Sequence, residues 1–185
     1  NMFVELGYVV KVYDGESYGE YAFSHIDENE IDNIVEEVKN HVMPWAHKLP
    51  EGMNVKQYPA IPDEKYNFEK STEYEISPDE LGDEEIVKRL SAVREKALAQ
   101  DKKIVEVQTG CVYQIYHKLF LSPNKDMTQN VMWTTGMMMG LIPKGEEMKM
   151  AFDSCSGCGG MELTDGLETK IPQLVQKLND LAASE

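Results

Sequence analysis

The sequence predicts an α+β fold, in which two or three amphipathic helices pack on one face of an antiparallel or mixed sheet. Three observations predict this class. Strand-like segments come in runs joined by short turns, as in hairpins and a β-meander, and do not alternate one by one with helices. Apolar residues recur at helical spacing in three separate segments. The chain has 185 residues, which is long enough for one domain with its own core.

The chain opens with a predicted hairpin. Residues 2–13 are rich in β-branched and aromatic side chains, which favour a strand. The dipeptide Asp14-Gly15 is a strong hairpin-turn signal, so a second strand is expected over residues 17–24.

A first helix is expected after Asp27, which we predict as its N-cap, with Glu30 completing a capping-box-like pair. One apolar stripe then follows at helical spacing: Ile31, Ile34, Val35, Val38 and Val42. Pro44 should end or kink this helix. Residues 48–82 are rich in proline and acidic side chains and predict a long surface excursion, with a short strand near residues 55–58.

Two further helices and a meander complete the predicted fold. A second amphipathic helix is expected over residues 83–100. A terminal helix is expected from an apolar stripe that runs from Leu167 to Leu181, with Pro172 tolerated in its first turn. Between these helices the apolar period changes from 3.6 to 2. Four extended segments are expected there: 103–109, 112–121, 128–142 and 146–153.

Charge makes nucleic acid an unsuitable partner. The chain has 18 basic and 33 acidic residues, a net charge of −15, and no basic stripe offsets this locally. No apolar run reaches the roughly 20 residues that a membrane span needs, so no membrane partner is expected. Three cysteines, an odd number, do not suggest a disulfide framework, and the cytoplasm is the expected location.

A glycine-rich segment, residues 152–163, holds two of the three cysteines. The C-x-x-C spacing of Cys155 and Cys158 suits a redox pair, or a zinc site completed by Cys111 and His117. However, we expect loop and strand after the second cysteine, where a redox motif needs a helix. The simpler interpretation is a glycine-rich loop that ends the meander, with reduced cysteines and no assigned metal.

Methionines crowd the meander, where they fill a core or adapt to varied peptides. The strand of residues 133–140, if it lies at an edge, could add an extended peptide. The candidate residues for a substrate cleft or interface are Trp133, Gly136, Gly140, Gly157, Gly159, Gly160 and Glu162. The sequence contains no G-x-S-x-G, P-loop or H-E-x-x-H motif, so no catalytic residue is assigned.

Several cues in order resemble the N-terminal domain of the TldD/PmbA family. Residues 8–19, running on to Phe23-Ser24 and the capped helix, are similar to that family's first strand-turn-strand. Four later segments fit the rest of the domain: the helix ending at 101–103, the strand 104–107, the strand ending at 119–124, and residues 156–162. Members of this family were once described as modulators of DNA gyrase and are regarded as zinc-dependent metalloproteases.

The resemblance implies a non-catalytic N-terminal domain of a peptidase that hydrolyses extended or unfolded peptides. Such a domain would wall the substrate cleft and help to form a homo- or heterodimer. The family's zinc motif, H-E-x-x-x-H, lies beyond this domain and is absent from this sequence. The chain is therefore expected to be a truncated domain, with zinc only in the full-length protein. The alternative is a stand-alone peptide- or protein-binding module without catalytic activity.

Overall fold

The structure is a computed structural model that describes residues 3–48 and 62–184. The α+β class is confirmed, with helices and antiparallel or mixed strand pairing. The chain divides into two compact units, Asn1–Pro62 (unit 1) and Asp63–Glu185 (unit 2), where the sequence predicts a single domain. The short strand expected near residues 55–58 lies outside the described residues.

Unit 1 is a hairpin followed by a helix. Strands β1 (Tyr8–Tyr13) and β2 (Tyr18–Phe23) pair antiparallel. The Asp14 carboxylate closes their turn by accepting the backbone N–H groups of Glu16 and Ser17, both at 3.0 Å. The N–H of Ser17, then His47 and the N–H of Glu16, lower the pKa of Asp14 to about 2. The predicted hairpin is thus confirmed together with its turn.

The helical part of unit 1 begins at Asp27, whose side chain accepts the N–H of Asn29. Its segments are η1 (Glu28–Glu30), α1 (Ile31–Glu37), the π-helical η2 (Val38–Val42) and α2 (Met43–Ala46). Pro44 does not end the helix. Because proline has no N–H and its ring crowds the carbonyl one turn back, the widened π-turn just before it is one way to accommodate the ring.

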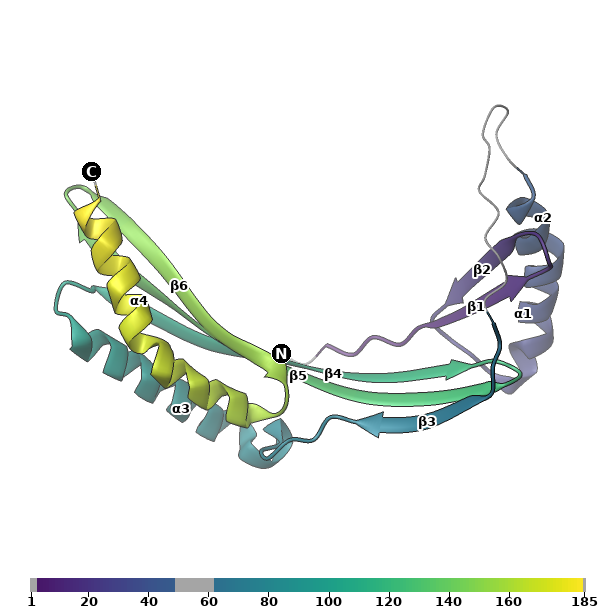
Figure 1. Ribbon diagram of the computed structural model, residues 1–185, viewed down its shortest axis with the longest axis horizontal. Coiled ribbons are helices and arrows are strands. Elements are labelled where there is room, and N and C mark those ends of the chain that lie inside the picture. Colours follow the sequence, from purple (N-terminus) through teal and green to yellow (C-terminus); the bar gives the residue numbers. More distant parts are fainter. Residues whose placement is uncertain (1–2, 49–61, 185) are drawn as a thin grey trace. The chain divides into compact units, whose positions relative to one another are not determined.

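Unit 2 is built around one long hairpin. Its elements are β3 (Tyr66–Ser71), α3 (Pro78–Gln100), β4 (Glu106–Leu121), β5 (Lys125–Lys144), β6 (Glu147–Cys158), η3 (Met161–Asp165) and α4 (Gly166–Ala183). Strand β5 is central (Figure 1). It pairs antiparallel with β4 along its length and with β6 over residues 133–144, and parallel with β3 over residues 125–130.

Several predicted boundaries differ from those in the structure. The two predicted segments 103–109 and 112–121 merge into one strand that begins at Glu106, because Gly110 keeps its place in the ladder opposite Met137. The interval 48–82 contains β3 and the start of α3, whose first turn is set off by Gly82 at φ 75°. The terminal helix α4 is confirmed from Gly166, but Pro172 lies inside it, beyond the first turn where it was expected.

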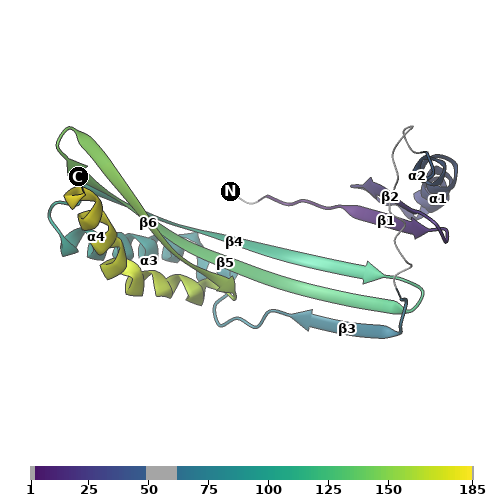
Figure 2. The ribbon, with the colours of Figure 1, turned by 45° about the horizontal axis from the view of Figure 1, so that its top comes forward.

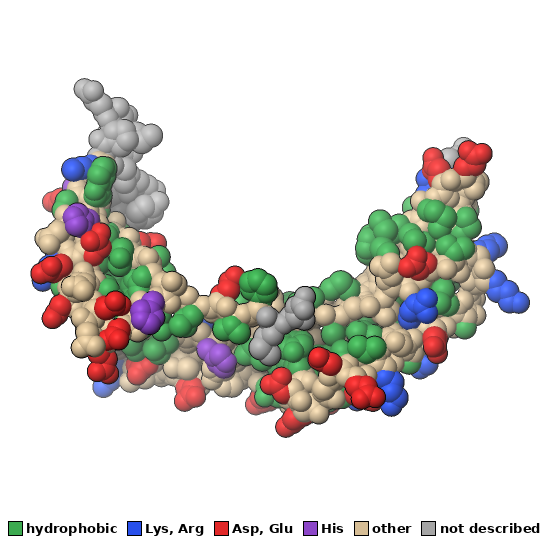
Figure 3. Space-filling view, turned by 180° about the vertical axis from the view of Figure 1, so that it is seen from behind, with side chains coloured by type: hydrophobic (Ala, Val, Ile, Leu, Met, Phe, Trp, Pro, Cys, Tyr) green, Lys and Arg blue, Asp and Glu red, His purple; other side chains and the backbone are tan. Residues whose placement is uncertain are grey.

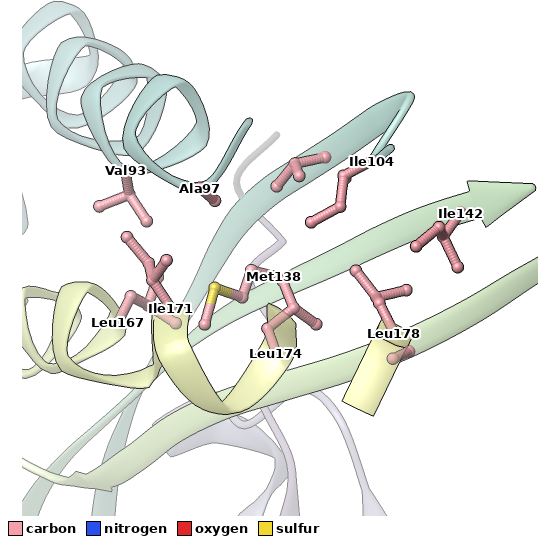
Figure 4. Close-up of a cluster of buried hydrophobic side chains, with 11 residues drawn as sticks. Val93, Ala97, Ile104, Met138, Ile142, Leu167, Ile171, Leu174 and Leu178 are labelled. Atoms are coloured by element: carbon pink, nitrogen blue, oxygen red, sulfur yellow. The ribbon is translucent and has the colours of Figure 1, made fainter. Parts of the chain in front are cut away.

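Helices α3 and α4 lie on one face of the sheet formed by β4, β5 and β6, as Figures 1 and 2 show. The core lies between these helices and that face (Figure 4). It is one cluster of buried apolar side chains: Val93, Ala97, Ile104, Val107, Met138, Ile142, Ala151, Leu167, Ile171, Leu174 and Leu178. Strands β4 and β5 continue beyond the helices with β3 alongside (Figure 2), and we call this part, residues 66–71, 113–121 and 125–131, the arm.

Candidate functional site: the helix-free face of the sheet

Strand β5 separates two very different surfaces. Its even-numbered residues from Met132 to Ile142 are buried. Because side chains alternate across a strand, its odd-numbered residues, such as Trp133 and Met137, lie on the opposite face. No helix of the described part of unit 2 packs on that side, which we call the helix-free face.

The helix-free face is strongly apolar. Residues opposite one another in the two ladders share it, so β4 and β6 each extend the surface of β5. Six of its large apolar side chains are each between 41% and 59% exposed: Val112, Trp133, Met137, Met148, Met150 and Phe152. Hydrophobic groups gather at the right-hand end of the surface in Figure 3, where the helix-bearing part of unit 2 lies. Contiguous apolar surface of this kind marks interaction sites on proteins.

Charge distribution sets the same hairpin apart. Residues 107–145 contain a single acidic residue, Asp126, although the chain has 33. They also contain Lys118, Lys125 and Lys144. The hairpin is therefore slightly basic in a chain whose net charge is −15. A contact made by this hairpin avoids most of the like-charge repulsion that other surfaces of the chain would bring.

The outer edges of the sheet are capped where the helices lie. Arg94 of α3 donates from Nε to the carbonyl of Val107 on β4 at 2.9 Å. Lys177 of α4 donates from Nζ to the carbonyl of Phe152 on β6 at 3.0 Å and to the Asp153 carboxylate at 2.8 Å. Each cap satisfies an outward backbone group, so neither edge is open to another strand at these positions.

Among the candidate residues, only Trp133 lies on the helix-free face as an exposed side chain. Gly136 and Gly140 lie beneath α4 instead. A Cβ at Gly136 would be 3.0 Å from Leu167 Cδ1, and one at Gly140 would be 2.6 Å from Leu178 Cδ1. These two glycines let α4 approach the sheet, which is a packing role.

Gly157, Gly159, Gly160 and Glu162 also face inward. Cβ atoms at Gly157 and Gly159 would meet Leu163, and a Cβ at Gly160 would be 2.2 Å from the carbonyl oxygen of Ile76. They belong to the junction that ends the meander rather than to an open cleft.

Glu162 fastens this junction to the segment before α3. Its carboxylate accepts the backbone N–H of Gly160 at 2.6 Å and that of Ile76 at 3.1 Å. Burial by itself raises the pKa of Glu162, but these backbone donors outweigh it and hold the pKa below its ordinary value. The Ile76 carbonyl in turn accepts the N–H of Met161 at 2.8 Å. The ionised Glu162 carboxylate thus has a structural role, and we call its two hydrogen bonds, to Gly160 and Ile76, the Glu162 latch.

The expected loop around the cysteines is wrong in one respect: Cys155 and Cys158 both lie in strand β6. The 3-10 helix η3 follows, where loop leading into strand was expected, and the expected terminal helix α4 comes after it. Cys155 is opposite Gly136 on the helix-bearing face, whereas Cys158 is opposite Trp133 on the helix-free face. Because the two side chains point to opposite faces, they cannot bind one ion or form a disulfide with each other.

The other proposed zinc ligands do not complete a site either. Cys111 and His117 share one side of β4 but are separated by six residues of strand, about 20 Å. Burial raises the pKa of the Cys111 and Cys155 thiols, so both are protonated at neutral pH. The described residues contain no group of three or more His, Cys, Asp or Glu side chains that could hold a metal ion.

The idea that residues 133–140 add a peptide at a sheet edge is wrong, because β5 is the central strand and is paired on both sides. The sequence reasoning missed Val112, Met150 and Phe152 as members of the exposed face. Met150 and Phe152 lie in β6, outside the acid-free run of residues 107–125, which was the available signal for Val112. That run identifies the hairpin, but it does not say which of its faces the helices cover.

Comparison with known proteins does not assign the chain to a family. No protein-family model matches the chain, and no curated protein matches it. Within residues 3–48 and 62–184, no helix has the length and apolar character required to span a bilayer.

Proposed function

We propose that this chain is a non-catalytic interaction domain of a TldD/PmbA-like zinc-dependent peptidase that acts on extended or unfolded peptides in the cytoplasm. The observation that carries the proposal is the helix-free face, with its exposed Trp133, Met137 and Phe152 and its lack of acidic residues other than Glu106. A catalytic domain packed beside this face would bury part of it and leave the rest as a wall of the substrate cleft.

The number of exposed apolar side chains on the helix-free face supports this role. Six large apolar side chains, each about half exposed, lie on this one face, and large exposed apolar patches on single proteins are often functional. Methionine makes up half of the six, and its flexible thioether packs against many side-chain shapes. Such a surface suits a wall that meets peptides of varied sequence. The zinc of the proposed peptidase would be held outside this chain, because its sequence has no H-E-x-x-x-H motif.

The test uses the protein encoded by the complete gene. We expect it to contain an H-E-x-x-x-H motif, to bind zinc, and to cleave a reduced, unfolded protein. Phe152→Asp should lower that cleavage, because it puts a charge on the helix-free face. The matched control is Val87→Asp, since Val87 is 60% exposed on α3. A full-length protein without the motif and without zinc-dependent cleavage would contradict the peptidase proposal.

The alternative is a stand-alone peptide- or protein-binding module without catalytic activity. The same apolar face favours it. Binding of extended peptides by the 185-residue chain alone, with no metal, and its loss in Phe152→Asp, would support this alternative over the peptidase.

A further inference from the structure

The outer edge of β4 in the arm is the feature that the proposed function leaves unexplained. Strand β4 pairs with β5 over all 16 of its residues, and no other strand of the described residues pairs with it. Near the helices this outer edge is capped by Arg94. Over residues 113–121, no hydrogen bond within the described part of unit 2 reaches the outward backbone groups.

The ladder identifies which backbone groups point outward. The Val107 carbonyl points away from β5, because it accepts the hydrogen bond from Arg94. In an antiparallel pair the direction of N–H and C=O alternates along the strand, so the other odd-numbered residues point outward too. In the arm these are Tyr113, Ile115, His117, Leu119 and Leu121.

This edge lacks the devices that normally keep strands from pairing. Residues 107–121 contain no proline and no acidic residue, and Lys118 is their single lysine. Side chains on both faces of the strand are apolar and 42% to 64% exposed: Ile115, Tyr116, Leu119, Phe120 and Leu121. A long, apolar, uncapped edge is a template for another strand.

We propose that this edge pairs antiparallel with the same edge of a second copy of the chain, so that one sheet runs through a symmetric dimer. The inference rests on the proposed function, since the family resemblance behind it implies a dimer, and it gives that dimer a surface. Charge selects a second copy as the occupant. Two chains of net charge −15 repel each other over most contacts, but the run from residue 107 to residue 125 brings no acidic residues together.

The geometry also allows a closed, two-fold arrangement. A register with Ile115 on the axis pairs odd-numbered residues with odd-numbered residues, as the outward backbone groups require. In that register Lys118 lies opposite Val112 of the other copy. The two Lys118 side chains are then six residues apart along the strands, about 20 Å, and do not repel strongly.

The experiment measures the mass of the purified chain by light scattering over a range of concentrations and salt. We expect about twice the chain mass of 21.0 kDa, and a dimer that tightens as salt screens the repulsion. Ile115→Pro removes an outward N–H and leaves the hydrogen bonds between β4 and β5 in place. Edge strands tolerate proline at such outward positions. It should weaken the dimer by about tenfold or more. Ile115→Thr keeps both the N–H and the β-branched side chain and should dimerise normally.

Hydrogen exchange provides the second measurement. Amides of residues 113–119 should be protected in the dimer and exchange faster in Ile115→Pro. If that variant does not fold, Leu119→Lys tests the same edge by placing a charge on it. A chain that is monomeric at all concentrations, or a dimer unaffected by both variants, would overturn the inference. A monomer that binds a labelled extended peptide at this edge would also overturn it. None of these outcomes decides whether the full-length protein is a peptidase.

Discussion

At the scale of single residues, the glycine-rich segment owes its sequence to packing. The Glu162 carboxylate accepts two backbone N–H groups at the junction before α4, those of Gly160 and Ile76. Gly160 lies so close to the Ile76 carbonyl that a side chain cannot fit. The Thr134 hydroxyl donates to the carbonyl of Gly159 at 2.9 Å and is completely buried. The polar atoms of this segment are used to close the fold.

Glu162→Gln should lower the free energy of unfolding by about 1–3 kcal/mol, because an amide NH₂ would face one of the two backbone donors. Chemical denaturation at neutral pH measures the change. Glu168→Gln is the control, since that exposed carboxylate forms its ion pair with the exposed Lys96. Equal effects of the two substitutions would refute the latch.

The Glu162 latch should also depend on pH. The folded-state pKa lies below the ordinary value of 4.5, so its contribution is complete above about pH 4.5 and is lost as pH falls through the folded-state pKa. The stability difference between wild type and Glu162→Gln should therefore shrink in acid. A difference that stays constant from neutral pH to strong acid would show that ionisation is not involved.

Gly140→Ala should destabilise unit 2 by about 1–3 kcal/mol, because the added methyl group overlaps the fully buried Leu178. Gly110→Ala is a matched control in the neighbouring strand, where the methyl group would meet only Met137 Cγ at 3.8 Å. Thermal unfolding followed by circular dichroism compares them. If Gly140→Ala is as stable as Gly110→Ala, α4 does not pack as closely as the structure indicates.

At the scale of elements, the two helices do more than cover a sheet face. Each helix also provides one basic side chain that donates a hydrogen bond to an outward carbonyl at the sheet edge. Arg94 of α3 binds β4 in this way, and Lys177 of α4 binds β6. Capping stops where the helices stop. Within the described part of unit 2 no such cap reaches the outer edge of β4 in the arm, and the apolar side chains of the arm lie on both faces. Strands with apolar residues on both faces are typical of strands that are covered on both faces.

Lys177→Met tests the cap on β6. It should lower the free energy of unfolding by about 2–3 kcal/mol, because Asp153, whose side chain is only 7% exposed, loses its cation. Lys96→Met is the control, since its partner Glu168 is 54% exposed. Adding Asp153→Asn to Lys177→Met should recover part of the loss in a double-mutant cycle. No recovery would mean that the Lys177 stem, not its charge, provides the stability.

At the scale of the whole molecule, the two units differ in how well they can stand alone. Every member of the large core cluster lies between Val93 and Leu178 in unit 2. Among the described residues of unit 1, Val38 is the one buried apolar side chain. A single hairpin with one helix and so small a core is marginal by itself.

Residues 63–185 alone should therefore keep a cooperative thermal transition, whereas residues 1–62 alone should lack one. Circular dichroism of the two separate fragments and of the whole chain measures this. The whole chain should show the transition of the 63–185 fragment. Cooperative melting of residues 1–62 by themselves would contradict the division of stability described here.

The sequence by itself determined the first hairpin, the amphipathic helices and the alternating pattern of the meander. The Asp14-Gly15 turn, the Asp27 cap and the apolar stripe of residues 86–97 act over a few neighbours, so they can be read locally. The period-2 pattern of the meander likewise determines that successive side chains point to opposite faces of the sheet. The sequence also places almost all acidic residues outside the β4–β5 hairpin.

Only the tertiary structure decided which of the two alternating sets of strand side chains the helices cover. It also decided that the outer edge of β4 in the arm has no partner strand among the described residues. That choice depends on α3 and α4, which are distant in sequence from the strands they cover, and on β5 lying between its partners. It sends Cys155 and Cys158 to opposite faces, turns Gly136 and Gly140 toward α4, and leaves Trp133 and Phe152 exposed. Local sequence sets alternation, but long-range packing chooses the buried side.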